Sequence, residues 1–276
     1  MPKCKYDWPE AGQRKLLGKR ISRLDGPAKV NGQAKFSHDI NRPGMLHAKI
    51  LGCPHAHAQV KVLDTSEAEK LPGVKAVRII QGVGSEIQWA GDEVVAVAAV
   101  SEEIAKDAIS KIKVEYEVLP HLVHEQDLSQ AGDRAKPAPE QRSGDPDAAF
   151  KDPEAVVSEG FYGTPVIVHC VLEAHGGVAE WSDAQNLKVW LSTQNVSGLP
   201  AQFAEALGIP AANVQAVCQH MGGGFGSKFS PDRWGIEMAR LAKDAGRPVK
   251  LVLERDAEIL VAGARPSHFA KIRVAA

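Results

Sequence analysis

The chain has 276 residues, enough for two ordinary domains or one large one. Its 33 basic and 34 acidic residues balance and only 5% of its residues are aromatic, so neither a nucleic-acid surface nor an acidic membrane surface is predicted. No apolar run approaches the ~20 residues of a membrane span, and the first residues lack the apolar stretch of a signal peptide, so we expect a cytoplasmic protein.

The cysteines are spaced too widely to form a local metal site. Cys4, Cys53, Cys170 and Cys218 include no CxxC pair. A zinc knuckle or an iron–sulfur cluster needs thiolates at short spacings, so neither can be assembled locally. A chain of this length also does not need a disulfide framework. We therefore expect reduced, mostly buried thiols and no metal ion bound directly by this chain.

The first half of the chain is predicted to be an extended arm followed by a folded unit. Residues 1–16 are polar and basic without periodicity, and the folded unit is expected over residues 17–128. Its clearest part is a continuous apolar run over residues 94–100, typical of a buried strand, followed by Ser101 as a helix N-cap. A helical pattern and then an alternating pattern over residues 111–118 follow. We therefore predict two parallel strands joined by a helix.

The second half is predicted to form another unit over residues 146–276. A linker over residues 129–145, rich in Ala, Gly, Pro, Gln and Arg, separates the two units. Helices are expected over residues 200–208 and 230–246, because each range opens near a proline and ends at a glycine. Strands are expected over residues 155–159, 177–181, 187–192, 214–219 and 249–253.

A glycine cluster over residues 222–226 follows a predicted strand and precedes a predicted helix. The Walker loop and the dinucleotide fingerprint both require glycine where this chain has Ser227, so both patterns fail by one residue. Glycines still permit positive φ angles and close approach to a ligand. We expect the amides of Phe225 and Gly226 to face a pocket and to favour an anionic or oxo group. A tight structural turn is the alternative.

Three further positions carry polar side chains that could contact a ligand. Glu173 and His175 lie two residues apart and would share one face of an extended segment, as an acid–base pair or as a satisfied structural pair. Gln194 ends a predicted strand, where side-chain amides often reach a ligand, although a lone glutamine is usually a turn residue there. His55 and His57 could chelate a metal, but no third ligand is near, which favours an exposed strand.

These motifs occur together in the order found in one known family. The segments KLLGKRISRLDGPAKVNGQAKFSHDINRPGMLHAKILGCPHAHAQV and GDEVVAVAAVSEEIAKDAISKIKVEYEVLP resemble the a/b hammerhead domain of molybdenum hydroxylases. LEAHGGVAEW, VWLSTQN and QHMGGGFGSK resemble three successive segments of the first molybdopterin-binding domain. The chain thus resembles, from about Leu17 onward, the N-terminal part of the molybdenum-cofactor-binding subunit of the xanthine dehydrogenase/aldehyde oxidase family.

The resemblance implies an α+β fold, with a hammerhead domain over residues 17–128 and part of a molybdopterin-binding domain over residues 146–276. It implies an oxidoreductase that hydroxylates aldehydes or aromatic heterocycles, its small-molecule substrates, with oxygen from water. The implied cofactor is the molybdenum cofactor, as molybdopterin or its cytosine dinucleotide form. The implied partners are an iron–sulfur subunit, an FAD subunit and the downstream molybdopterin-binding half.

The downstream half matters because it holds the family's general-base glutamate and most pterin-binding loops. The sequence ends at residue 276 in what its pattern predicts to be the middle of a strand. We therefore expect the missing half on a second polypeptide or lost by truncation, and this chain alone to be inactive.

The resemblance also assigns roles to individual residues. Gln194 is implied to hydrogen-bond a molybdenum oxo ligand. The backbone amide of Phe225 is implied to lie against the cofactor, in a loop that Gly223, Gly224 and Gly226 shape.

The substrate pocket is expected to include Phe229, Glu173 and His175. Purine-oxidising members of the family carry a glutamate where this chain has Phe229, so a purine substrate is not expected. Packing of the Phe229 ring beneath the following helix is the alternative.

Two other functions of the protein remain in competition. One is a non-catalytic binding or assembly protein that retains the hammerhead scaffold, and the other is a nucleotide-binding protein, against which the failed glycine spacings count.

Overall fold

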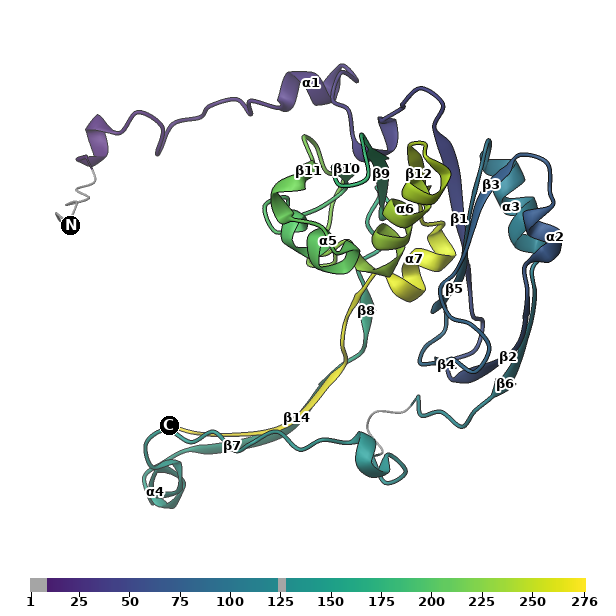
Figure 1. Ribbon diagram of the computed structural model, residues 1–276. Coiled ribbons are helices and arrows are strands. Elements are labelled where there is room, and N and C mark those ends of the chain that lie inside the picture. The colour runs from purple at the N-terminus through teal and green to yellow at the C-terminus, as the bar shows by residue number, and fades with distance from the viewer. Residues whose placement is uncertain (1–8, 124–127) are drawn as a thin grey trace. The chain divides into compact units, whose positions relative to one another are not determined.

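The computed structural model of the chain describes residues 9–123 and 128–276 (Figure 1). The chain divides into two compact units, Met1–Lys35 and Phe36–Ala276. The described part of the first unit contains the 3-10 helix η1 (Ala11–Gln13) and the short helix α1 (Gly26–Val30). The start of the predicted N-terminal arm lies outside the described residues.

The second unit mixes strands and helices along its whole length, which confirms the predicted α+β class. Its strands are β1 (Leu46–Gly52), β2 (Ala58–Asp64), β3 (Val74–Ile79), β4 (Glu86–Ile87), β5 (Glu93–Ala99), β6 (Lys113–Val118), β7 (Val157–Thr164), β8 (Ile167–Val168), β9 (Gly176–Trp181), β10 (Leu187–Leu191), β11 (Val214–Val217), β12 (Val249–Val252), β13 (Ala264–Arg265) and β14 (His268–Ala275). Its helices are η2 (Ser37–Asp39), α2 (Ser66–Glu69), α3 (Glu102–Lys111), η3 (Gly132–Arg134), α4 (Pro146–Lys151), α5 (Leu199–Leu207), η4 (Ala211–Asn213), α6 (Asp232–Ala245) and α7 (Arg255–Val261). None of the described helices is both long and apolar enough to span a membrane.

A seven-stranded sheet with the order β11-β10-β9-β12-β1-β5-β3 forms the centre of the second unit. Strand β12 joins its two parts, because it pairs antiparallel with β9 and parallel with β1. Strands β1, β3 and β5 come from the predicted first unit, whereas β9 to β12 come from the predicted second unit. The predicted linker over residues 129–145 therefore does not separate two sheets.

Strand β5 is buried on both faces, which explains its continuous apolar sequence. Ala96 and Ala98 belong to a hydrophobic cluster with α6, while Val95 and Val97 belong to a second cluster that includes Ala108 of α3. Because successive side chains of a strand point to opposite faces, α6 and α3 cover opposite faces of β5. The predicted N-cap is confirmed, since the Ser101 hydroxyl accepts the backbone N–H of Ile104 at 3.3 Å.

The prediction that α3 joins two parallel strands of one sheet is wrong. Strand β6 lies in a separate three-stranded sheet with the order β4-β2-β6, where it runs antiparallel to β2. Both edges of β5 are already hydrogen-bonded, one to β1 and the other to β3, each antiparallel. Strand β6 therefore has no free edge of β5 to pair with.

Helices α5 and α6 lie over one face of the large sheet (Figure 1). Both end where predicted, at glycines in the left-handed conformation, Gly208 (φ 67°) and Gly246 (φ 60°). Phe203 of α5 and Trp234 of α6 are fully buried in the same hydrophobic cluster as β9, β10 and β12. Burying one such side chain contributes about 1.5–3 kcal/mol, so the two helices are firmly packed on the sheet that carries the residues discussed below.

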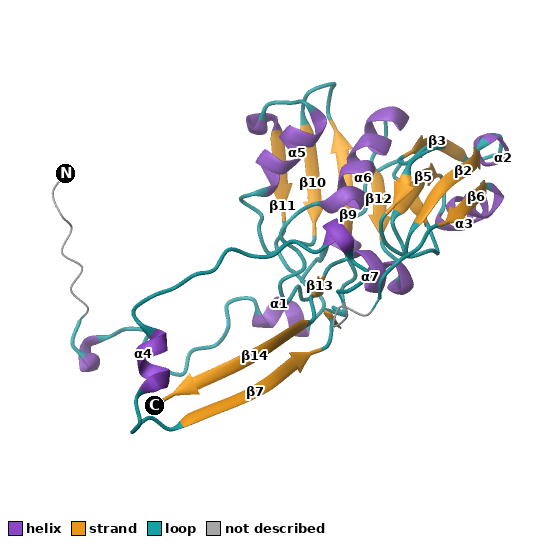
Figure 2. Cartoon of the chain, turned by 90° about the horizontal axis from the view of Figure 1, so that it is seen from below, coloured by secondary structure: helices purple, strands orange, loops and turns teal. Residues whose placement is uncertain are grey.

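Strands β7 and β14 form a separate two-stranded antiparallel ribbon, visible as two long arrows in Figure 2. They pair from Val157 with Ala275 to Thr164 with His268. The sequence pattern predicted only a short strand at residues 155–159, because β7 is exposed on both faces and lacks the alternation of a half-buried strand.

Candidate functional site

The glycine cluster lies in residues 222–228, which we call the glycine loop, between β11 and α6. Its backbone is left-handed at Gly223 (φ 107°), Phe225 (φ 54°) and Gly226 (φ 106°). That conformation is accessible to glycine but strained for phenylalanine. The Phe225 side chain is 74% exposed, so burial of the ring does not hold it in this conformation. The surrounding contacts therefore constrain the loop through its backbone.

The side chain of Gln194 lies directly on the glycine loop. Its Oε1 accepts the backbone N–H of Gly226 at 2.9 Å and that of Lys228 at 3.4 Å. A Cβ atom at Gly224 would lie 2.4 Å from this oxygen, so any larger residue there would displace the Gln194 side chain from its present position. Because two N–H groups face the oxygen, the carboxamide has one orientation. Its nitrogen has no acceptor in the part of the chain that the structure describes, so it is free to donate to a ligand.

Backbone amides of the glycine loop are also available to a ligand. In residues 9–123 and 128–276, no acceptor pairs with the N–H of Gly223 or of Phe225. The expectation that the Gly226 amide faces the pocket is wrong, because it donates to Gln194. Unpaired N–H groups in a left-handed turn favour an anion. With the Gln194 nitrogen, these donors fit an anionic, oxo-bearing group such as the molybdenum cofactor.

Glu173 is buried beneath the glycine loop and does not line an open pocket, contrary to expectation. Its side chain is 7% exposed, and its Oε2 accepts the Ser192 hydroxyl at 2.7 Å and the Gly222 N–H at 2.6 Å. It makes no hydrogen bond to His175. The two residues precede β9 in an irregular segment and have separate hydrogen-bond partners.

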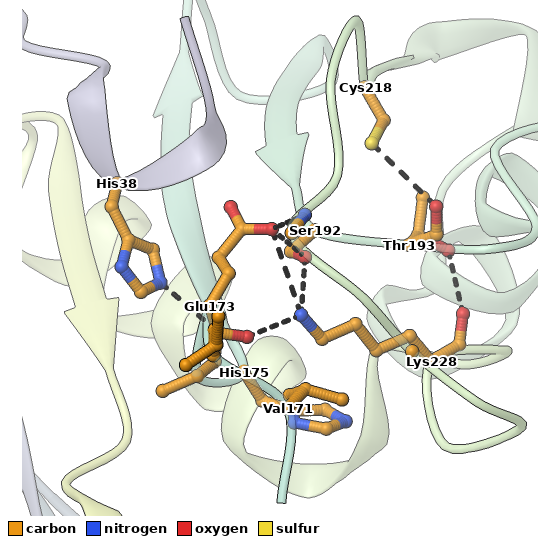
Figure 3. Close-up of polar contacts among 12 residues, drawn as sticks. His38, Val171, Glu173, His175, Ser192, Thr193, Cys218 and Lys228 are labelled. Atoms are coloured by element: carbon orange, nitrogen blue, oxygen red, sulfur yellow. Dashed lines mark hydrogen bonds and ion pairs between the residues drawn. The ribbon is translucent and has the colours of Figure 1, made fainter. Parts of the chain in front are cut away.

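Sequence reasoning missed Lys228, which it considered only as the lysine of a failed Walker pattern. Its side chain is fully buried, and Nζ donates to the Glu173 carbonyl oxygen and to Ser192 Oγ, both at 2.6 Å (Figure 3). Burial lowers the pKa of Lys228. The only local signal for Lys228 is its position beside the glycine cluster. A buried lysine needs hydrogen-bond acceptors, and here these come from other segments of the chain.

His175 is a buried histidine that also lies outside any open pocket. Its ring is 1% exposed; Nε2 lies 3.3 Å from the Ser227 carbonyl oxygen and Nδ1 lies 3.5 Å from Glu258 Oε1. Burial lowers the pKa of His175 to about 4. The ring is therefore neutral at pH 7, and its contact with Glu258 is not an ion pair. The alternative of a structural histidine is the one that this environment favours.

This buried ring makes the stability of the fold depend on pH. In the unfolded chain the ring has a pKa of 6.5, so the unfolded state binds a proton first as the pH falls. The contribution of His175 to the free energy of unfolding is complete above pH 6.5 and should fall by about 3 kcal/mol as the pH approaches 4.

The measurement is urea unfolding from pH 4 to 8 of the wild type and of His175→Gln. Burial raises the pKa of Glu258, which acts in the opposite sense, so the difference between the two chains isolates His175. The same pH dependence in both chains would contradict the assignment.

Phe229 exposes its side chain, as a residue of an open pocket must. The residue is 52% exposed, so its ring is not buried beneath the helix that follows. Its backbone is fixed, because the carbonyl oxygen accepts N–H groups from Asn195 at 3.2 Å and from Gln202 at 3.3 Å. The structure therefore places an exposed aromatic ring directly after Lys228.

The remaining candidates do not extend this site. His55 and His57 lie in a bend before β2, not on a strand as expected, and His57 Nε2 lies 2.7 Å from Glu86. No group of three or more His, Cys, Asp or Glu side chains is arranged to hold a metal in the described ranges. Cys53, Cys170 and Cys218 are free thiols, Cys170 is exposed rather than buried as expected, and Cys4 lies outside the described residues.

Comparison with known proteins places these features in a family. The profile of the molybdopterin cofactor-binding domain matches residues 128–276, and that of the aldehyde oxidase and xanthine dehydrogenase a/b hammerhead domain matches residues 31–86. The chain is 28% identical over 294 residues to the aldehyde oxidoreductase molybdenum-binding subunit PaoC of Escherichia coli (strain K12), covering 99% of this chain and 40% of that protein.

Two further comparisons agree. Xanthine dehydrogenase/oxidase of Mus musculus is 30% identical over 280 residues, which cover 94% of this chain and 21% of that protein. The crystal structure of the aldehyde oxidoreductase from Desulfovibrio desulfuricans ATCC 27774 superposes with a TM-score of 0.81 at 27% identity, covering 98% of this chain and 34% of that one. The chain thus spans less than half the length of these relatives. It carries the cofactor-binding and hammerhead sequences, and it belongs to the xanthine dehydrogenase/aldehyde oxidase family of molybdenum-cofactor-binding proteins.

Proposed function

We propose that this chain supplies part of the molybdenum-cofactor site of a hydroxylase that oxidises aldehydes or aromatic heterocycles with oxygen from water. The observation that carries the proposal is the orientation of Gln194. Its oxygen is engaged by two amides of the glycine loop, which leaves its nitrogen as a donor beside the unpaired amides of Gly223 and Phe225. Membership of the family supports the same site.

The molybdenum cofactor, when bound, supplies the two-electron oxidation chemistry. The residues of this chain bind and orient it. The amides of Gly223 and Phe225 donate to an anionic group, and Gly224 leaves room for the Gln194 side chain. The Gln194 nitrogen is a fixed neutral donor, which stabilises negative charge that develops on an oxygen during the reaction.

The activity is proposed for a complete assembly, since the chain spans 40% or less of PaoC and of mouse xanthine dehydrogenase/oxidase. The proposed location of this assembly is the cytoplasm. A downstream molybdopterin-binding half would supply the general base. An iron–sulfur subunit and an FAD subunit would carry the electrons away. Molybdopterin and its cytosine dinucleotide form both remain candidates for the cofactor.

Metal and pterin analysis of the purified native complex tests this proposal. We expect stoichiometric molybdenum together with a pterin. Release of cytidine monophosphate on mild acid hydrolysis would identify the dinucleotide form. A complex without molybdenum would contradict the proposed function and favour a non-catalytic binding or assembly protein on the same scaffold.

The exposed ring of Phe229 gives an expectation about the substrate. A phenyl ring cannot accept a hydrogen bond from a polar ring nitrogen, and an apolar wall discriminates by only ~1–3 kcal/mol per methylene. We expect broad oxidation of apolar and aromatic aldehydes and poor oxidation of purines. The measurement is kcat/KM on a panel of both classes for the complete enzyme and for Phe229→Glu, which should shift the preference toward purines.

Phe161→Glu is the matched control, because that phenylalanine is 68% exposed on the β7–β14 ribbon, outside the glycine loop. It should leave the preference unchanged. Efficient purine oxidation by the wild-type enzyme would refute the inference from Phe229.

A further inference from the structure

A buried ion pair joins the two ends of the glycine loop (Figure 3). At the start of the loop, the Gly222 N–H donates to Glu173 Oε2 at 2.6 Å. At its end, Lys228 Nζ lies 3.7 Å from the same oxygen. The side chain of Glu173 is 7% exposed and that of Lys228 is 0% exposed. One largely buried carboxylate therefore contacts both ends of the loop.

The hydroxyl of Ser192 completes the connection between the two charges. It accepts from Lys228 Nζ at 2.6 Å and donates to Glu173 Oε2 at 2.7 Å. Lys228 Nζ also donates to the Glu173 carbonyl oxygen at 2.6 Å. The ammonium group thus has partners for its buried protons, as a buried charge requires.

The Glu173 carboxylate, unlike the Lys228 ammonium group, is not fully hydrogen-bonded. Glu173 Oε1 is buried and has no hydrogen-bond partner in the part of the chain that the structure describes. A buried ion pair adds little net stability even when fully hydrogen-bonded, and an unpaired oxygen reduces that further. Stability of the fold therefore does not explain this arrangement.

The backbone of Lys228 connects the ion pair to Gln194. The Lys228 carbonyl oxygen accepts the backbone N–H of Gln194 at 2.7 Å and the Thr193 hydroxyl at 3.1 Å. The Lys228 N–H donates to Gln194 Oε1 at 3.4 Å. The position of Lys228 therefore sets both the backbone and the carboxamide of the residue that faces the ligand.

We propose that Glu173 and Lys228 are positioning residues that fix the ends of the glycine loop and so keep the Gln194 nitrogen directed toward the cofactor. This inference rests on the proposed function and assigns it two further residues. Both side chains are buried beneath the loop, so in this proposal they act through the loop and through Gln194 and not by direct contact with the cofactor or substrate. A purely structural ion pair would affect stability alone.

The test compares the complete enzyme with Lys228→Met, with Glu173→Gln/Lys228→Met and with Ser192→Ala. Hydrogen–deuterium exchange of the peptide over residues 219–229 reports on the loop, and kcat and KM are measured per bound molybdenum. In Lys228→Met, we expect loop amides to exchange roughly tenfold faster. We expect kcat to fall about a hundredfold, with KM changed much less, because small displacements of a catalytic donor are costly.

The double variant separates positioning from stability. It contains no unpaired buried charge, so it should regain most of the melting temperature lost in Lys228→Met but neither the loop protection nor the kcat of the wild type. Ser192→Ala keeps both charges and folds most readily, and we expect an intermediate increase in loop exchange. Lys49→Met is the matched control, because Lys49 is 12% exposed and pairs with Glu102 and Glu254 away from the loop. It should leave loop exchange unchanged.

Unchanged loop exchange in molybdenum-loaded Lys228→Met or Ser192→Ala enzyme would overturn the proposal, as would recovery of kcat in the double variant. Failure of the proposed function looks different. A wild-type complex without molybdenum would contradict that function, whereas the exchange rates depend on the loop and its ion pair alone.

Discussion

Replacing Gln194 by alanine in the complete enzyme is expected to lower kcat by about 10²–10³, with little change in melting temperature. The carboxamide nitrogen is a fixed donor that acts where negative charge develops, while the side chain is exposed and fills no part of the hydrophobic core. The measurement is steady-state kinetics normalised to molybdenum content, with thermal unfolding of the same preparations.

A matched variant distinguishes the donor from the acceptor of the same side chain. Gln194→Glu retains an oxygen for the N–H groups of Gly226 and Lys228 but removes the amide nitrogen. It should therefore keep the loop ordered and still lose kcat. If Gln194→Ala keeps full activity while its melting temperature falls, Gln194 is structural and its proposed role is wrong.

Lys228→Met is expected to lower the free energy of unfolding by about 3–5 kcal/mol, because it leaves the carboxylate of Glu173 buried without its cation. The double variant Glu173→Gln/Lys228→Met removes both charges and should recover most of this loss. Replacing a whole buried ion pair by neutral groups is often neutral in stability. Urea unfolding of the three chains at one pH measures both quantities.

An equal loss of unfolding free energy in Lys228→Met and in the double variant would contradict this explanation. The loss would then come from the hydrogen bonds that Lys228 Nζ makes to Ser192 and to the Glu173 carbonyl oxygen, which neither variant retains. Lys49→Met provides the reference for removing a less deeply buried paired lysine, and we expect a clearly smaller effect there.

The sequence by itself determined the features that depend on neighbouring residues. The apolar run of β5, the Ser101 cap and the terminal glycines Gly208 and Gly246 are local signals, and the structure confirms each of them. The order of the motifs identified the family, because several long segments had to agree at once. The same local logic located the glycine loop, whereas the resemblance to the family singled out Phe229.

Only the tertiary structure decided which groups meet across the chain. No local pattern shows that β1 and β3 occupy both edges of β5 and send β6 to another sheet. Nor does one show that Gln194 accepts the Gly226 N–H or that Glu173 pairs with Lys228. Such pairings depend on burial and on competition for hydrogen-bond partners between segments far apart in sequence, and packing fixes them only when the sheet forms.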